Sequence, residues 1–464
     1  MDHPASSRAG VIVSAPGRRA SLRLSYANAA AWGLGNGLVS STLVIYLGLE
    51  LGAKNTALAA ALILSAPQFL GLLRFSAPAL IDRLADRKTF CVGCYAASAL
   101  LLLLLPWAAA PGRLATPERS LVAMVAIWSL YHLLEYLGTV TLWSWLADLV
   151  PGRIRGAFIG HRERWLLVGT IVGMVATGIG TYLWRSHIEN SATWNPGDRW
   201  LGYAAYALLG ALAMLAATIP LMRMATVTTT ASRPADHVRR RLAELLAPLG
   251  DARYWHLLLF GCTIAFFNGL TQSIQFLYPA AVLGLSLFAM LTLRSTMRLG
   301  QIAISPTMGR LADRFGNRPV MIACQAIVAT GPAFYLLATS QAPWFVAGAW
   351  LAWIAYAGLN VCLPNLMIKL ATPHLRAAYI AAYFAITGLT YGLATVVGGW
   401  LVDTFRDERF YAFGTTQIWG IYDLMFFLGW IGRTGSVVLL FMVIEPGAKP
   451  LSQLLRGEPQ DATK

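Results

Sequence analysis

Residues 309–319 read GRLADRFGNRP, and residues 78–88 read PALIDRLADRK, a related charged phrase in the first half of the chain. Aligned without gaps, the shared positions are Leu80, Asp82, Arg83 and Arg87 in the first copy and Leu311, Asp313, Arg314 and Arg318 in the second. Each copy follows a hydrophobic segment. The recurrence indicates that the chain is internally duplicated.

Around these two phrases the chain is strongly apolar. Of its 464 residues, 57% are hydrophobic and only 12% are charged, and the mean hydropathy is +0.58, whereas soluble domains usually carry about 25% charged residues. Stretches long enough to cross the hydrocarbon core of a bilayer as helices are predicted at residues 25–49, 56–76, 90–109, 120–147, 164–184, 200–222, 254–280, 284–308, 319–339, 344–370, 377–402 and 419–443. The sequence therefore predicts an all-α membrane protein with twelve transmembrane helices.

The net charge of +15 could indicate a nucleic-acid partner, but the distribution of the basic residues argues against one. Most of them fall in segments that share one side of the predicted membrane, such as Arg18–Arg19, 83–88, 153–164, 239–241 and 310–318. This bias is the positive-inside pattern of an inner (cytoplasmic) membrane protein, with contact to anionic lipid. It predicts that both termini are cytoplasmic, and we expect no nucleic-acid partner.

The predicted helices divide the chain into two six-helix units. We expect a cytoplasmic tail at 1–23, a first bundle at 24–222, a cytoplasmic linker at 223–253, a second bundle at 254–443 and a cytoplasmic tail at 444–464. The linker holds apolar residues at helical spacing beside Arg239–Arg241, a pattern typical of a helix lying on the membrane surface. A regulatory or partner-binding helix is the alternative.

The second charged phrase matches Gly-x-Leu-Ala-Asp-Arg-x-Gly-x-Arg, and the chain resembles the major facilitator superfamily, which carries this loop signature between helices eight and nine. The first copy departs from it at Pro78 and Ala85. The resemblance implies two parallel six-helix repeats, a central cavity lined by helices one, four, seven and ten, and transport by alternating access. It also implies gating loops containing Asp82, Arg83, Arg87, Gly309, Asp313, Arg314, Gly316 and Arg318.

Polar side chains lie in stripes along several predicted helices. In lipid such groups must face a cavity or a partner, so the stripes predict where substrate binds. The substrate-binding candidates are Asn28, Trp32, Asn36, Trp128, Asn268, Gln272, Gln275, Trp353, Tyr356 and Asn360, with the deep arginines Arg294 and Arg298. Ser40 in helix one and Tyr383, Thr387 and Tyr391 in helix eleven extend the pattern. Hydrogen bonding between helices is the alternative interpretation for each member.

Arg294 and Arg298 are the most deeply placed charges in helix eight. Because they share one helical face, their planar guanidinium groups could clamp a carboxylate or phosphate. A structural ion pair with a buried acid is the alternative. We interpret Arg433 in helix twelve as structural, because the resemblance places that helix at the periphery, with Asp423 as a distant partner.

Glu135 lies in the middle of helix four, with His132 one turn before it. Burial disfavours a charged carboxylate, so Glu135 is a candidate proton carrier with His132 beside it. A neutral, hydrogen-bonded glutamic acid that joins helices is the alternative. The His-x-x-Glu pair supplies too few ligands for a specific metal site, so no metal is predicted.

These features predict a secondary transporter for a small organic solute, sugar-like or anionic, coupled to protons. The chain has no nucleotide-binding phrase and no His-Glu-x-x-His set, and we expect no cofactor and no enzymatic activity. Its five cysteines lie in or beside predicted helices, which implies no disulfide framework. We expect a monomer in the lipid bilayer. A transport-inactive sensor and a membrane enzyme are the alternatives.

Overall fold

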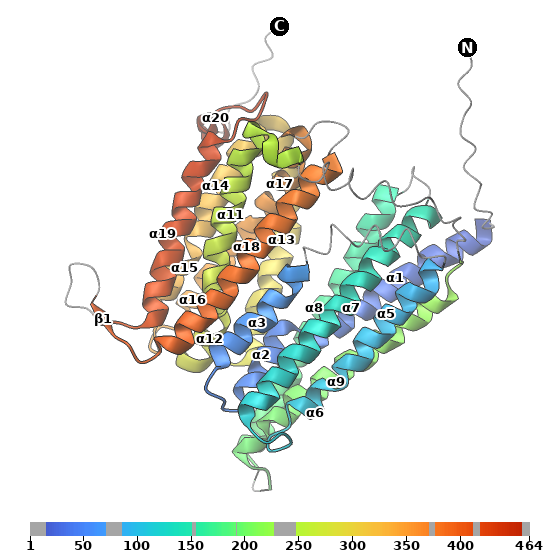
Figure 1. Ribbon diagram of the computed structural model, residues 1–464, viewed down its shortest axis with the longest axis vertical. Helices are drawn as coiled ribbons and strands as arrows, with labels where there is room; N and C mark the ends of the chain where they lie inside the picture. Colours follow the sequence, from blue (N-terminus) through green and yellow to red (C-terminus); the bar gives the residue numbers. More distant parts are fainter. Residues whose placement is uncertain are drawn as a thin grey trace.

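A computed structural model describes residues 15–70, 86–150, 155–191, 193–226, 247–370, 376–411 and 418–456. Within these ranges the chain is helical except for short connections and one two-stranded hairpin. Helices suit the hydrocarbon core because they satisfy every backbone hydrogen bond internally. Figure 1 shows two helical bundles, the first half of the chain in blue to green and the second in yellow to red.

The first bundle contains a helix in each of its six predicted membrane spans. The helices are α1 (Ala15–Leu38), α2 (Ser41–Leu49), α3 (Thr56–Phe69), α5 (Arg87–Leu102), α6 (Leu105–Ala108), α7 (Pro117–Leu149), α8 (Arg155–Glu189) and α9 (Arg199–Arg223), with the 3-10 turn η3 (Pro196–Asp198). The first span is broken into α1 and α2. At the break, the Ser40 hydroxyl accepts a hydrogen bond from the Leu43 N–H and caps α2.

The second bundle repeats this arrangement with more irregular turns. Its elements are the 3-10 turn η4 (Ala247–Gly250), α11 (Ala252–Gln272), α12 (Ile274–Leu277), the π-helical turn η5 (Tyr278–Val282), α13 (Leu287–Phe315), α14 (Asn317–Ala329), α15 (Gly331–Leu337), α16 (Phe345–Ala352), the 3-10 turn η6 (Trp353–Ala355), α17 (Tyr356–Leu370), α18 (Arg376–Thr404), β1 (Phe410–Tyr411), β2 (Ile418–Trp419), α19 (Ile421–Met442) and α20 (Leu451–Arg456). The tenth span is interrupted by η6.

Ten helical stretches in the described residues are long and apolar enough to cross a membrane. The other two predicted spans are α3, which has 14 residues in the described range, and α13, which has 29 residues but carries Arg294 and Arg298. A helix is thus present in all twelve predicted stretches, and the prediction of a twelve-helix membrane fold is confirmed. The linker between residues 227 and 246 lies outside the described residues.

Several helices extend beyond the predicted membrane-crossing stretches. Helix α1 begins at Ala15 rather than near residue 25, and α13 continues to Phe315 rather than ending near residue 308. The phrase 309–315 is therefore helical, and only Gly316, with a φ of 98°, separates α13 from α14. Hydropathy marks the part of a helix inside hydrocarbon, whereas these helices continue as charged turns. The β1–β2 hairpin was not predicted.

Within the first bundle, glycines allow α1 and α8 to pack closely. A Cβ atom added at Gly169 would lie 2.2 Å from the Ala30 carbonyl oxygen, and one added at Gly173 would lie 2.4 Å from the Leu34 oxygen. No side chain fits at either position. This small-xxx-small pair brings two backbones together without bulky groups between them.

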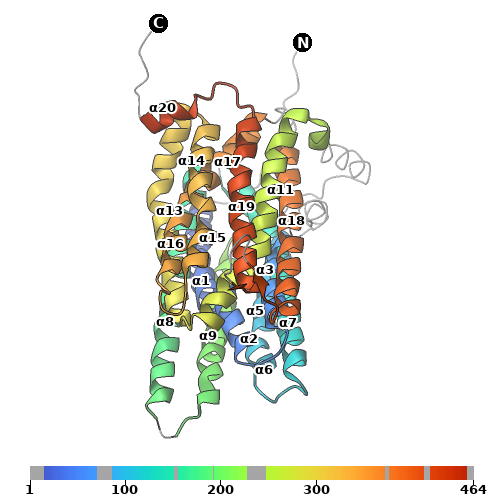
Figure 2. The same ribbon diagram turned by 90° about the vertical axis from the view of Figure 1, so that its left-hand side faces the viewer.

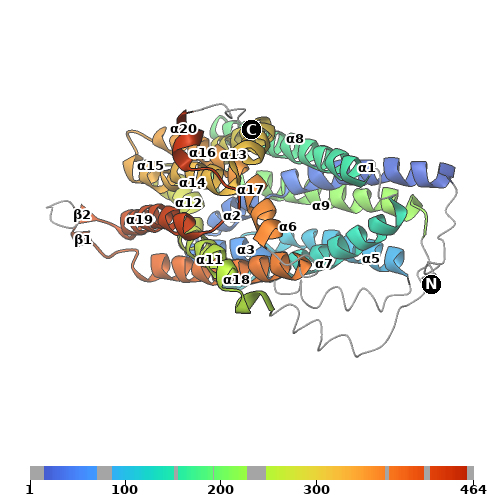
Figure 3. The same ribbon diagram turned by 90° about the horizontal axis from the view of Figure 1, so that it is seen from above.

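The two bundles lie side by side (Figure 3) and contact each other through α3 with α18 and through α8 with α13. We call the end of the molecule at which α20 lies the terminal side, and the opposite end the far side; Figure 2 shows α20 at the top and α6 near the bottom. In Figure 1 the bundles approach each other towards the far side. There, a Cβ atom at Gly399 would lie 2.6 Å from the Ala57 carbonyl oxygen.

Asp403 bonds the two bundles together at the far side. Its carboxylate, at the end of α18, accepts hydrogen bonds from the Leu58 N–H at 2.7 Å and the Ala57 N–H at 3.3 Å. These amides belong to the first turn of α3, where the helix dipole favours a negative charge. Arg406 adds bonds to Asp403 at 3.0 Å and to the Thr56 hydroxyl at 3.3 Å. The first turn of α3 is thus capped by the other half of the chain.

Candidate functional site

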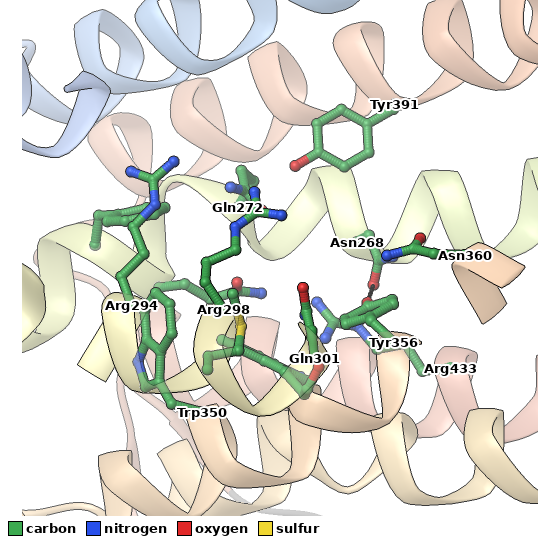
Figure 4. Close-up of a pocket in the computed structure, with 14 residues that line it drawn as sticks. Asn268, Gln272, Arg294, Arg298, Gln301, Trp350, Tyr356, Asn360, Tyr391 and Arg433 are labelled. Atoms are coloured by element: carbon green, nitrogen blue, oxygen red, sulfur yellow. Dashed lines mark hydrogen bonds between the residues drawn. The ribbon is translucent and has the colours of Figure 1, made fainter. Parts of the chain in front are cut away.

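The main candidate site is a cavity of about 360 Å³ in the second bundle. Its walls come from α11, α12, α13, α18 and α19 and from the interrupted tenth span. The lining residues are Asn268, Gln272, Gln275, Phe276, Arg294, Met297, Arg298, Gln301, Trp350, Trp353, Tyr356, Asn360, Tyr391 and Arg433. Figure 4 shows these side chains converging from different helices. Every second-half substrate candidate from the sequence lies in this set.

Three arginines give the cavity its charge. Arg294 and Arg298 lie one turn apart on α13, and Arg433 enters from α19 (Figure 4). Arg433 is 1% exposed, donates a hydrogen bond to the Thr271 hydroxyl at 2.5 Å, and lies 5.9 Å from the centre of the Trp353 ring. None of the three forms an ion pair within the described part of the chain. The 14 lining residues include no Asp or Glu.

Amide and hydroxyl groups surround these cations. Gln275 donates to the Thr271 hydroxyl at 2.8 Å, and Gln301 donates to the Trp353 carbonyl at 3.1 Å. The Tyr356 hydroxyl donates to the Asn268 side-chain oxygen at 3.3 Å, the bond drawn dashed in Figure 4. These bonds orient the polar groups of the wall before any ligand arrives.

Gln272 and Asn360, by contrast, make no side-chain hydrogen bond to another described residue although both line the cavity. An amide carries two donors and an acceptor with two lone pairs. Within the described part of the chain, both amides are therefore available to a solute.

A second cavity, of about 740 Å³, lies between the halves. It is lined by Asn36 and Ser40 of the first span, by residues 163–174 of α8, and by Arg294, Arg298, Leu299 and Ile302 of α13. Arg294 and Arg298 therefore line both cavities. Glu163 and Arg164 lie near the start of α8, so this cavity extends from the arginines towards the terminal side.

The first-half candidates are placed differently from those of the second half. Of the four, only Asn36 lines the cavity between the halves. The Asn28 side chain is 1% exposed, donates to the Ala217 carbonyl and accepts a hydrogen bond from Arg162. Trp128 is 3% exposed and donates to the Ile63 carbonyl. In this structure Asn28 and Trp128 join helices, which is the alternative role that their sequence pattern left open.

Trp32 bonds to the candidate proton carrier. Its indole N–H donates to Glu135 Oε1 at 3.2 Å, and His132 Nδ1 lies 3.1 Å from Glu135 Oε2. No Lys or Arg pairs with this carboxylate among the described residues. The Tyr131 hydroxyl, one turn before Glu135, donates to the Asn36 side-chain oxygen at 3.1 Å. Asn36 thus connects the surroundings of Glu135 with the cavity between the halves.

The duplicated charged phrases are only partly described. Asp82 and Arg83 lie outside the described residues, while Arg87 begins α5. In the second copy, Asp313 is exposed and has no partner among the described residues. Its gating role, with those of Gly309, Arg314 and Arg318, stays a prediction.

Glu445 binds the start of α14, at the end of the second charged phrase. Its buried carboxylate accepts hydrogen bonds from the Arg318 N–H at 2.7 Å, the Asn317 amide at 2.8 Å and Lys369 Nζ at 2.7 Å. Burial alone would raise the pKa of Glu445, but the hydrogen bonds from Lys369 and the α14 residues outweigh it and hold the pKa below the ordinary value of 4.5. Glu445 thereby joins the ends of α14 and α17 to the segment after α19.

We expect Glu445→Gln to lower the free energy of unfolding at neutral pH by about 1–3 kcal/mol, because the amide loses the charge and half of the acceptors that three donors use. Since the folded-state pKa of Glu445 is depressed, its contribution is complete above 4.5 and is lost as the pH falls through the folded-state value. Thermal unfolding in detergent measures this: the stability of the wild-type protein should approach that of Glu445→Gln as the pH falls. Glu408→Gln, at an exposed glutamate, is the control and should unfold like the wild-type protein. A stability difference between wild type and Glu445→Gln that does not change with pH would contradict this role of the Glu445 charge.

Six of the lining residues were not predicted as substrate candidates: Phe276, Met297, Gln301, Trp350, Tyr391 and Arg433. Gln301 follows Arg294 and Arg298 at helical spacing, so extending that stripe by one turn would have found it. Tyr391 belongs to the helix-eleven stripe, of which only this member lines the cavity. The structural interpretation of Arg433 does not extend to an ion pair with Asp423, because Asp423 accepts the Gly420 N–H at the start of its own helix.

The second half of the chain matches a known family in sequence. Residues 290–457 match the family model described as Major Facilitator Superfamily. A "Proline/betaine transporter" of Salmonella typhimurium is 30% identical over 111 residues, 24% of this chain and 22% of the relative. The "Uncharacterized MFS-type transporter YfkF" of Bacillus subtilis is 25% identical over 183 residues, 37% of this chain and 45% of the relative. The chain thus aligns with less than half the length of these relatives.

Solved structures match over almost the whole chain. The nucleoside transporter NupG superposes with a TM-score of 0.60 at 16% identity, covering 92% of this chain and 98% of that one. The D-xylose-proton symporter superposes with a TM-score of 0.65 at 13% identity, covering 93% and 99%. At these identities the likeness establishes the fold alone.

Proposed function

We propose that this chain is a secondary transporter of the major facilitator superfamily and that it carries a small organic anion. The match of residues 290–457 to the family and the likeness of the fold to solved transporters support this proposal. The substrate binds in the cavity of the second bundle and crosses the membrane as the two halves rock about it. Positive charge on the terminal side orients that side towards the cytoplasm of the inner membrane.

The observation that carries this proposal is the set of three arginines without a carboxylate. A charge inside the membrane is costly unless a partner compensates it, and a structural ion pair would supply that partner from the protein. Within the described residues the cavity wall offers no acid to Arg294, Arg298 or Arg433. A carboxylate or phosphate on the substrate compensates them, and charge-assisted bonds to guanidinium groups are among the strongest available.

The rest of the cavity favours a polar substrate body. Gln272 and Asn360 have amide groups with no hydrogen-bond partner among the described residues, and Trp350 and Trp353 add aromatic rings to the lining. A volume of about 360 Å³ suits a metabolite rather than a large amphiphile. The proposed substrate class is therefore a small carboxylate or phosphate that also carries hydroxyl or amide groups.

Glu135 supports coupling to protons. It is a carboxylate inside the first bundle whose hydrogen-bond partners, Trp32 and His132, can serve both its charged and its neutral form. An anion that enters with a proton carries less net charge across the membrane. We assign the coupling proton to the Glu135–His132 pair, whose side chains lie 3.1 Å apart.

The charge of the cavity can be tested before a substrate is known. In a Met297→Cys protein, an anionic methanethiosulfonate should react faster than a cationic one of similar size, because Met297 lines the cavity with the arginines. Arg298→Gln should slow the anionic reagent and speed the cationic one about tenfold each, so that the ratio of the two rates falls about a hundredfold. The reason is that a unit charge at about 10 Å changes the energy of each reagent by about 1–2 kcal/mol at an effective dielectric constant of about 20. The parent protein, which keeps Met297 and its five native cysteines, supplies the background rate.

Arg310→Gln is the matched control. It removes the same charge from the same helix, but Arg310 is exposed and does not line the cavity. This variant should keep the anionic preference. Equal rates for the two reagents in the Met297→Cys protein would refute an anion site.

A further inference from the structure

Arg294 belongs to the second half of the chain but is held by the first. One of its terminal nitrogens, Nη1, donates to the Thr42 hydroxyl at 2.8 Å and lies 3.4 Å from the Ser41 hydroxyl. Both hydroxyls are in the first turn of α2, directly after the break in the first span. Thr42 is fully buried, so this bond is shielded from water.

Arg298 provides the contrast. It lies one turn further along α13, lines the same two cavities, is exposed, and has no hydrogen-bond partner among the described residues. A guanidinium has five N–H donors in a rigid fork. Arg294 uses one terminal nitrogen for the first half, and its other donors remain available where the two cavities meet.

The helix that contains Thr42 makes a second bond to the other half of the chain. The Tyr46 hydroxyl, one turn after Thr42, donates to the Leu285 carbonyl at 2.8 Å, just before α13 begins. Two residues of the same short helix, Thr42 and Tyr46, therefore bond to Arg294 inside α13 and to Leu285 just before α13. When the halves separate on the far side, both bonds must break together.

We propose that Thr42 is a positioning residue for transport: it orients the Arg294 guanidinium, so that Arg294 and Arg298 form a two-arginine anion site only while α2 contacts α13. This inference rests on the proposed function. When the far side opens, α2 moves away from α13 and the bond between Thr42 and Arg294 is lost. The anion is then bound only by Arg298 and by an Arg294 side chain that is no longer held in place. The anion is consequently bound more tightly while the far side is closed than while it is open.

Arginine-specific modification by phenylglyoxal, mapped by peptide mass spectrometry, tests this without a known substrate. In the wild-type protein Arg294 should react more slowly than Arg298, because its bond to Thr42 restrains it. Thr42→Val keeps the shape but removes the hydroxyl, and should speed modification of Arg294 about tenfold, the usual effect of losing a hydrogen bond to a charged group. Thr42→Ser retains a hydroxyl and should restore the slow rate.

Arg298 is the internal control for folding and for access of the reagent. An unchanged Arg294 rate in Thr42→Val overturns the inference, and so does an equal rise at Arg294 and Arg298, which would mean general loosening. The labelling experiment on the Met297→Cys protein tests the anion site independently of Thr42. If Arg298→Gln lowers the anionic preference while Thr42→Val leaves Arg294 unaffected, the anion transporter stands and the positioning role of Thr42 does not.

Discussion

Glu135→Gln should abolish accumulation of the substrate driven by a pH gradient, while substrate binding is preserved. Glutamine has nearly the same shape as the protonated acid and can keep the bond from Trp32, but it can neither release nor accept a proton. The protein is then fixed in one state of the coupling cycle. Exchange between equal pools of substrate needs no net proton movement and should continue.

The measurement is uptake into proteoliposomes with an imposed proton gradient, using an anion found by thermal-shift screening of the purified protein. Glu189→Gln, at the far end of α8 and paired with Arg185 and Arg199, is the control and should accumulate substrate normally. Undiminished accumulation by Glu135→Gln would show that the proton travels elsewhere. Loss of binding would instead assign Glu135 a structural role.

Asp403→Asn should open the far side of the molecule. The Asp403 carboxylate accepts two backbone N–H groups from the first turn of α3 and one bond from Arg406. An asparagine has one acceptor oxygen, no charge to complement the helix dipole, and an NH₂ group facing donors. Losing charge-assisted bonds of about 1.5–3 kcal/mol should raise the population open on the far side about tenfold or more.

Labelling of Met297→Cys by an impermeant maleimide, added to the far side, measures this population. The matched control is Asp407→Asn, the same substitution one turn beyond Asp403, at a side chain that is exposed and has no partner among the described residues. It should label at the parent rate. If Asp403→Asn also labels at the parent rate, the capped first turn of α3 does not hold the halves together.

The fold was largely predictable because hydropathy and duplication report on properties that each helix has by itself. Apolar length marks the spans, and the repeated phrase relates the halves. The break between α1 and α2 was not predictable in this way, since Val39 and Ser40 sit inside one continuous apolar stretch. The break depends on contacts that the sequence pattern does not report: Ser40 caps α2, and Thr42 accepts a hydrogen bond from Arg294 of the other half.

The site was predictable to the extent that polar residues in hydrocarbon need partners. That reasoning found Asn268, Gln272, Arg294 and Arg298, all of which line the cavity. It could not decide whether the partner is a solute or another helix, because this depends on how each helix is rotated in the bundle. Asn28 faces α9 and α8, so its partners are protein groups.

Arg294, Arg298 and Arg433, which form no ion pair with a described residue, should also make the proposed transport cycle sensitive to membrane voltage. Moving an elementary charge through the whole transmembrane potential changes the free energy by about 2.3 kcal/mol per 100 mV. When the halves rock without cargo, Arg294, Arg298 and Arg433 shift their uncompensated charge relative to the electric field, so this step should speed up or slow down with voltage. A bound anion cancels part of that charge. The return of the empty carrier, rather than the movement of its cargo, is then the step that the cell's resting potential controls.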